Sequence, residues 1–148
     1  MIRNGGKLPP DVHRKTPLLV EKIARDSDIA ALFVFGSFAD DKLTPLSDLD
    51  FAVLLRLDMS PSARFDKHLE LIGLFNETYK TDEIDPVVLN DAPLRFAHTI
   101  IKTGRLLHIA DKAALIDFYD RISKLYLDFR YFRDQFDEAF LEGIGYDG

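Results

Sequence analysis

Residues 29–55, which read IAALFVFGSFADDKLTPLSDLDFAVLL, hold two apolar segments with a polar connection between them. The first segment, Ile29–Phe35, is apolar throughout, which is typical of a strand that is buried on both faces of a sheet. It ends at Gly36-Ser37, and after ten further residues Asp48-Leu49-Asp50 begins the second segment, which continues to Leu55. The sequence therefore predicts two strands, with small or acidic residues at the ends that meet the polar connection.

One helix is predicted before these two strands in the chain, and another after them. Thr16-Pro17 and Ser60-Pro61 each place a hydroxyl-bearing residue directly before a proline, a combination that favours a helix start. We therefore expect one helix over residues 17–25. The other begins at Pro61, and its apolar residues recur at helical spacing, at Phe65, Leu69, Ile72, Phe75 and Tyr79.

A third strand is predicted over residues 83–89. Because Pro86 has no N–H to donate to a strand ladder, we place this strand at an edge of the sheet. A further helix is expected from about Pro93 to Gly104, a residue type that commonly ends helices, and residues 105–108 form a short extended link. The predicted fold is α/β (α+β), with a small mixed sheet flanked by helices and a long helical segment at the C-terminal end.

The C-terminal segment, residues 111–142, is predicted to be helical. If continuous, it would be about 48 Å long, more than the diameter of roughly 30–35 Å expected for a domain of this size. Part of its apolar stripe would then extend past the domain toward a partner. The alternative is a break near Asp128 that folds the helix back over the sheet. The stripe repeats at intervals of three and four, at Leu115, Phe118, Ile122, Leu125, Phe129, Phe132 and Phe136, widened by Tyr119 and Tyr126.

Composition restricts the classes of function. The 148 residues suit a single domain, with a core over 17–108 and the helical segment 111–142 appended to it. A net charge of −6 argues against broad, sequence-independent nucleic-acid binding, although a metal ion can neutralise a nucleotide's phosphates locally. The absence of cysteine excludes disulfides and thiol chemistry. We expect a cytoplasmic protein that does not cross a membrane, since no apolar run is long enough.

Asp48 and Asp50 are candidates for holding a divalent cation. Residues i and i+2 of a strand point to the same face, so their carboxylates would lie side by side and repel each other. Mg²⁺ prefers oxygen ligands of this kind, usually one or two carboxylates together with substrate phosphates and water. Asp85, in the predicted third strand, would complete a cluster of three carboxylates. The alternative is a polar turn before the strand, with Ser47 or Asp48 as a local cap.

Gly36 and Ser37 are candidates for phosphate contacts. Glycine at a strand end lets backbone amides approach a phosphate without a Cβ in the way, and the serine adds donors. The alternative is an ordinary turn. Lys42, the cation of this connection, and Ser47 are further candidates for phosphate contacts. The alternatives are that Lys42 is a solvated surface lysine and that Ser47 stabilises a turn.

The combination resembles the polymerase β-type nucleotidyltransferase superfamily. The resemblance rests on Gly36-Ser37 after one strand, ten residues, Asp48-x-Asp50 at the next strand, and an aspartate in a later strand. Among the members, the chain most resembles the small stand-alone MNT antitoxins that pair with HEPN-domain toxins. The likeness covers about residues 32–89, and more weakly Ala92–His108. It implies that fold, and Mg²⁺-dependent transfer of a nucleoside monophosphate from a nucleoside triphosphate.

Roles for individual residues follow from the resemblance. It implies that Gly36 and Ser37 bind the triphosphate. It also implies that Asp48 and Asp50 hold Mg²⁺ and align the α-phosphate. Asp85 would bind a second metal ion or act as the base toward the acceptor hydroxyl.

The connection departs from the family pattern at one point. Many relatives carry an arginine shortly after the Gly-Ser pair, whereas this chain has Phe38-Ala39-Asp40-Asp41. We expect both of these aspartates to face solvent, because carboxylates directed inward would repel the phosphates. Glu83 lies on the same face of the predicted strand as Asp85 and is an alternative for its role.

The function implied by the resemblance is that of an antitoxin enzyme. It would transfer AMP from ATP to a tyrosine of a partner HEPN ribonuclease toxin and so neutralise it, within a hetero-oligomer. One alternative is a nucleotidyltransferase that acts on a small molecule such as an antibiotic. Another is a non-catalytic antitoxin that acts by binding alone. The histidines are scattered singly, and none is assigned to a metal or to catalysis: His13, His68, His98 and His108.

Overall fold

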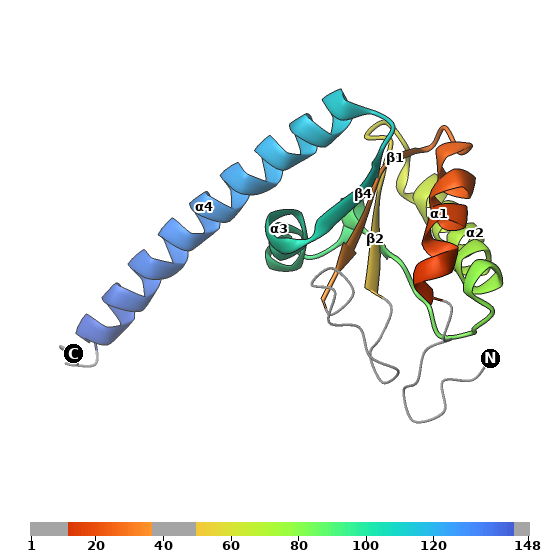
Figure 1. Ribbon diagram of the computed structural model, residues 1–148. Helices are drawn as coiled ribbons and strands as arrows, with labels where there is room; N and C mark the ends of the chain where they lie inside the picture. Colours follow the sequence, from red (N-terminus) through yellow and green to blue (C-terminus); the bar gives the residue numbers. More distant parts are fainter. Residues whose placement is uncertain (1–11, 37–49, 144–148) are drawn as a thin grey trace.

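The two apolar segments beside Gly36 form the central strands of the computed structural model, which describes residues 12–36 and 50–143 (Figure 1). β1 (Ile29–Phe35) has the boundaries that the sequence predicts, and all of its residues except the last are buried. β2 (Asp50–Leu55) runs antiparallel to β1, with Phe35 opposite Asp50. The two residues predicted to precede Asp50 in this strand lie outside the described residues.

The sheet has four strands in the order β3-β2-β1-β4. β3 (Val87–Val88) is parallel to β2 and β4 (Arg105–Ile109) is antiparallel to β1, so the predicted mixed sheet is confirmed. β4 is a paired strand where the sequence predicts only an extended link. β3 lies at an edge, as predicted, but the expected strand over 83–89 is wrong in length. Only two residues pair, because Pro86 has no N–H and the residues before it are held by side chains of a helix.

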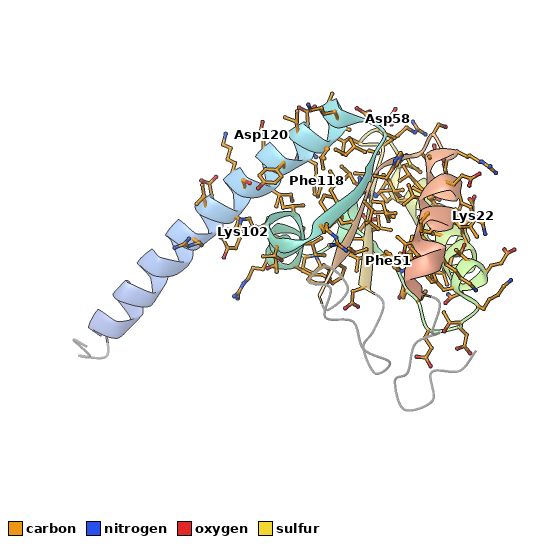
Figure 2. The ribbon with its side chains drawn as sticks, viewed as in Figure 1. Lys22, Phe51, Asp58, Lys102, Phe118 and Asp120 are labelled. Carbon is orange, nitrogen blue, oxygen red and sulfur yellow. The ribbon has the colours of Figure 1, made fainter. Side chains whose placement is uncertain are left out.

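α1 (Val12–Ala24) and α2 (Pro61–Tyr79) pack against one face of the sheet. Their buried side chains form one core cluster with sheet residues such as Phe51, which Figure 2 shows between the sheet and these helices. At the start of α2 the Ser60 hydroxyl accepts a hydrogen bond of 3.1 Å from the backbone N–H of Ala63, which confirms the predicted cap.

Two expectations about these helices need correction. Pro17 lies inside α1 and not at its first position, so the helix continues through it although one backbone hydrogen bond is lost. In α2 the apolar stripe is not uniformly buried. Phe75 and Tyr79 are in the core, whereas Phe65 and Leu69, nearer the start of the helix, remain 61% and 54% exposed.

The other face of the sheet is covered by α3 (Leu94–Thr103) and the first turns of α4 (Lys112–Gly143), and η2 (Leu89–Asp91) connects β3 to α3. Gly104 caps α3 as predicted. A Cβ at this position would lie 2.6 Å from the carbonyl oxygen of Ile100 and 3.1 Å from that of Val34. Glycine is therefore required because the end of α3 approaches the backbone of β1 closely.

α4 is one continuous helix, so the alternative of a break near Asp128 is wrong. Two of its side chains, Phe118 and Ile122, are buried in the second core cluster with residues of α3 and the sheet. One turn further along, Tyr126 stacks on His98 of α3, with ring centroids 3.8 Å apart. These contacts fix the first half of α4 on α3.

The second half of α4 extends away from the sheet (Figure 1). Figure 2 shows Phe118 turned toward the sheet and Asp120 turned away from it. Within the part of the chain that the structure describes, no helix combines the length and the apolar character needed to cross a membrane. Several large apolar side chains of α4 are about half exposed: Ile116, Tyr119, Leu125 and Leu127.

Candidate active site

Gly36 and Asp50 meet where β1 ends and β2 begins. Gly36 has a positive φ of 71°, a backbone conformation that glycine adopts without steric cost. A Cβ at Gly36 would lie only 2.8 Å from Oδ2 of Asp50, so the carboxylate lies directly against the glycine. The positive φ and the close approach both require glycine at this position. The fold thus brings the predicted phosphate-binding glycine and one predicted metal ligand into contact.

Asp85 lies two residues before β3, at the end of the sheet where β2 begins. β2 and β3 are parallel, with Ala52 opposite Val87 and Val53 opposite Val88, and the pairing does not extend back to Asp85. The predicted place of Asp85 inside the third strand is therefore wrong. Because strand residues two apart share a face, Asp50 belongs to the same face as Ala52, which is the face covered by α3. Gly36, Asp50 and Asp85 lie at the same end of three neighbouring strands.

Two polar residues of α2 hold the segment that carries Asp85. The side-chain amide of Asn76 accepts a hydrogen bond from the N–H of Ile84 and donates one to its carbonyl oxygen, both 2.8 Å long. Nε2 of His68 is hydrogen-bonded to Oδ1 of Asp85, also at 2.8 Å. Asn76 thus bonds the backbone of Ile84 as a neighbouring strand would. His68 orients the carboxylate of Asp85, whose side chain is 73% exposed.

His68 was missed by sequence reasoning. Its spacing from Asp85 along the chain is 17 residues, and the contact exists only because α2 packs beside the edge strand. Asn76 carries no signal either, since asparagine inside a helix usually contributes nothing beyond a polar surface. Both roles depend on tertiary contacts that a single sequence does not display.

A cavity of about 490 Å³ opens beside Asp85, between α2, β3 and the start of α3. Its lining is largely apolar and includes Phe65 and Phe96, which are 61% and 40% exposed, while His68 and Asp85 contribute polar groups. Phe96 also packs edge-on against Phe35, with ring centroids 5.7 Å apart. Phe96 therefore contacts both this cavity and the last residue of β1.

An ion pair joins two walls of this cavity. The guanidinium of Arg64 in α2 donates from Nε to both carboxylate oxygens of Asp91, at 3.0 Å each, and from Nη2 to Oδ1 at 2.8 Å. Its Nη1 also donates to the carbonyl oxygen of Met59 at 2.7 Å. The hydrogen bonds to Asp91 raise the pKa of Arg64 above its ordinary value. Because Asp91 ends η2, this pair fixes the distance between α2 and the entry to α3.

A second group of charges lies at the opposite end of β1 and β2. The ammonium of Lys67 is 2.8 Å from Asp26 and 3.2 Å from Asp28, and Arg56 donates to Asp28 as well. Hydrogen bonds from Arg56 and Lys67 lower the pKa of Asp28. Burial lowers the pKa of Lys67, but its hydrogen bonds to the two aspartates outweigh burial and raise it. This end of the sheet is an ion-paired network.

Four of the predicted site residues lie outside the described residues: Ser37, Lys42, Ser47 and Asp48. Over 12–36 and 50–143, no three metal-ligating side chains gather into one group. Glu83, the alternative to Asp85, lies outside β3, and its N–H donates to the hydroxyl of Thr81 at 3.3 Å. Of the described candidates, Gly36 and Asp50 are in contact, and Asp85 lies two residues before the neighbouring strand β3.

Comparisons with known proteins agree with this arrangement. Residues 19–113, more than half of the chain, match the family described as "Polymerase beta, Nucleotidyltransferase". This range includes β1, β2, β3 and all of the predicted site residues. No curated protein matches the chain.

Several solved structures share the fold. One, a toxin–antitoxin with AMP-PNP, matches with a TM-score of 0.59 and 18% identity over 86% of this chain and 97% of that one. Another contains a tri-AMPylated HEPN toxin from Shewanella oneidensis in complex with an MNT antitoxin. It matches with a TM-score of 0.54 and 18% identity over 85% of this chain and 98% of that one.

A third, the toxin–antitoxin MntA–HepT, gives a TM-score of 0.55 and 18% identity, over 87% of this chain and 98% of its own. At such identities the likeness establishes the fold alone. The family match stands on the sequence and spans the glycine corner and the strand aspartates. The chain therefore belongs to the polymerase β nucleotidyltransferase family.

Proposed function

We propose that this protein is a Mg²⁺-dependent antitoxin enzyme of the cytoplasm that transfers AMP from ATP to a tyrosine of a HEPN-type ribonuclease toxin. The observation that carries the proposal is the contact between Gly36 and the carboxylate of Asp50, with Asp85 two residues before the neighbouring strand β3. A glycine and two acidic side chains at one end of the sheet support a site for a metal-bound triphosphate. It lies in a chain whose family performs nucleotidyl transfer.

The residues of this corner fit Mg²⁺. Asp50 and Asp85 offer carboxylate oxygens, which are the ligands that this cation prefers, and Gly36, which has no side chain, lets the carboxylate of Asp50 lie against the backbone. Asp48, two residues before Asp50 in the sequence, is assigned as a further ligand from its sequence spacing and the family resemblance alone. Bound there, Mg²⁺ would neutralise the phosphates and stabilise charge on the reacting oxygens.

The protein's own groups would bind and orient the reactants. The N–H and hydroxyl groups of Gly36 and Ser37 would hold the triphosphate, with Ser47 and Lys42 as further contacts. The acceptor oxygen forms a bond to the α-phosphorus, and the bond from that phosphorus to the bridging oxygen breaks. Pyrophosphate leaves with the electron pair, and the hydroxyl proton passes to a base, for which Asp85 is the candidate.

A protein acceptor is supported by two observations. The solved structures that share the fold include a complex with an AMPylated HEPN toxin and one with AMP-PNP. In addition, α4 extends past the sheet with apolar side chains about half exposed, which suits a hetero-oligomer. We assign the whole of 1–148 to one functional unit, with a core over 17–108 and the helical segment 111–142.

The experiment combines this protein, ATP labelled in the α-phosphate, Mg²⁺ and the helical protein encoded by the neighbouring reading frame. We expect label on the neighbour, and its loss when Asp48→Ala and Asp50→Ala are combined. Asp58→Asn is the matched control, because Asp58 is exposed at the opposite end of the sheet. Continued labelling by the double variant would remove these aspartates from the mechanism.

The same experiment separates the alternatives. A non-catalytic antitoxin would neutralise its partner without transferring label, and the double variant would neutralise it equally well. A small-molecule enzyme would leave the neighbour unlabelled and would modify a low-molecular-weight hydroxyl compound instead.

A further inference from the structure

We infer that the cavity between α2, β3 and the start of α3 binds the aromatic ring of the acceptor tyrosine. This inference rests on the proposed function and assigns the acceptor to a place in the molecule. The observation behind it is an apolar cavity of about 490 Å³ that has Asp85 in its wall. Its volume falls within the range of roughly 300–1,000 Å³ that is typical of sites for small ligands and side chains.

The order of residues across the sheet places the acceptor on this side. Gly36 follows the end of β1, Asp50 begins β2 and Asp85 lies two residues before β3, and these strands are neighbours in the order β3-β2-β1. In phosphoryl-type transfer the attacking and leaving oxygens lie roughly in line through the phosphorus. With pyrophosphate held at Gly36 and the α-phosphate beside Asp50, the attacking hydroxyl must arrive from the side of Asp85. The cavity lies on that side.

The lining suits an aromatic ring. Phe65 and Phe96 present exposed ring surface from two different helices, and Pro61 and Val87 add apolar surface between them. Phe96 is held in place by its edge-on contact with Phe35. A third ring inserted between these walls would gain stacking and edge contacts in addition to burial.

The polar groups of the cavity suit a phenol. The lining holds the carboxylates of Asp85 and Asp91 and the guanidinium of Arg64. Asp91 is already paired with Arg64, so it leaves the apolar walls undisturbed. Asp85 and its partner His68 therefore form the polar end of the cavity, where the hydroxyl of a bound tyrosine ring would lie.

The first test is an NMR titration of the isotope-labelled full chain with N-acetyl-tyrosinamide, a phenol without the partner protein. We expect saturable shifts at the backbone amides of Phe65, Val87 and Phe96, and none around Asp28 at the other end of the sheet. The absence of saturable shifts at these amides would overturn the assignment. If AMP shifted these amides and the phenol did not, the cavity would bind the nucleotide base, and the assignment would also be overturned.

The second test is kinetic and uses two positions on the same helix. Phe65→Ala removes a cavity wall, whereas Leu69→Ala removes a similarly exposed side chain that lies outside the cavity. We expect Phe65→Ala to raise KM for the protein acceptor about threefold to tenfold, the range set by one aromatic contact, and to leave KM for ATP unchanged. Leu69→Ala should change neither. An unchanged acceptor KM in Phe65→Ala would overturn the assignment.

Failure of the proposed function gives a different result. If the unaltered protein transfers no label, the nucleotidyl-transfer proposal fails, while the phenol titration still decides what the cavity binds. If transfer occurs and the cavity variants behave like the unaltered protein, only the place of the acceptor is wrong.

Discussion

The acidic residues at the two ends of the β1–β2 pair have different partners. At the end with Asp26 and Asp28, the cations are part of the chain, since Lys67 and Arg56 bond directly to these carboxylates. At the other end, Asp50 lies against the backbone of Gly36 and Asp85 is bonded to a histidine. The first arrangement holds the fold together. The second places carboxylates where a phosphate-bound cation can reach them, and the two ends can be tested separately.

The largest expected effect comes from Gly36→Ala at the glycine end. The new Cβ would meet Oδ2 of Asp50 at 2.8 Å, in a backbone conformation that alanine adopts only with strain. Displacing Asp50 by even an ångström should lower transfer at least about 100-fold.

Gly73→Ala is the matched control for that variant. Gly73 lies within α2 with nothing within 4 Å of the added Cβ, so alanine should stabilise the helix by about 0.5–1 kcal/mol. Transfer assays and thermal unfolding measure both variants. Equal activity in the two would contradict the role of the glycine corner.

The next effect is on stability and belongs to the ion-paired end. Lys67→Met leaves Asp26 and Asp28 without their shared cation, and the lysine side chain is only 10% exposed. We expect a loss of about 2–3 kcal/mol in the free energy of unfolding, measured by urea denaturation. Transfer per folded molecule should stay unchanged. A selective loss of transfer would show that the two ends are coupled.

Two asparagines allow a direct comparison of the ends. Asn76 bonds both backbone groups of Ile84, next to Asp85, and Asn90 bonds both backbone groups of Leu55 at the end of β2. Alanine at either position should cost about 1–2 kcal/mol of stability, since each removes both hydrogen bonds to that backbone, and Asn76 in addition loses one to the carbonyl oxygen of Ile72.

Only Asn76→Ala should also lower transfer, by about tenfold, because it releases the residue before Asp85. Activity and unfolding are measured on the same samples. If Asn90→Ala lowered kcat as much as Asn76→Ala, the effect would reflect general loosening of the sheet and not the position of Asp85.

The smallest effect is a pH dependence of stability at the ion-paired end. Hydrogen bonds from Arg56 and Lys67 lower the pKa of Asp28 below its ordinary value of 3.8. The folded state therefore binds this proton less readily than the unfolded state. The stabilisation is complete above the unfolded pKa and is lost as the pH falls through the lowered folded value. Urea midpoints below about pH 4 should fall less steeply in Asp28→Asn than in the unaltered protein.

Features that depend on neighbours in the chain could be predicted from the sequence. The boundaries of β1 follow from seven consecutive apolar residues, and the start of α2 follows from Ser60 and Pro61. Gly36 can be identified as a candidate for phosphate contacts because it directly follows an apolar strand. In each case the residues that decide the structure lie within a few positions of one another.

Features that depend on contacts between residues far apart in the chain could not be predicted from the sequence. β3 is short because Asn76 holds Ile84, and His68 meets Asp85 only after α2 has packed. The packing of α4 on α3 includes a stack of Tyr126 on His98, two residues that lie 28 positions apart in the sequence. A periodic stripe in one segment does not reveal which of these surfaces will lie opposite it.

The anchoring of α4 sets a geometric scale for anything that binds its far half. Phe118, Ile122 and Tyr126 fix the helix on α3, and the remaining residues to Gly143 add roughly 25 Å of rigid rod at 1.5 Å per residue. A molecule bound to that part of α4 keeps a fixed position relative to the sheet, because α4 and the sheet both pack against α3. Lengthening or shortening α4 between this anchor and its far half would rotate the far half by about 100° per residue, so a binding surface there depends on the length of the helix.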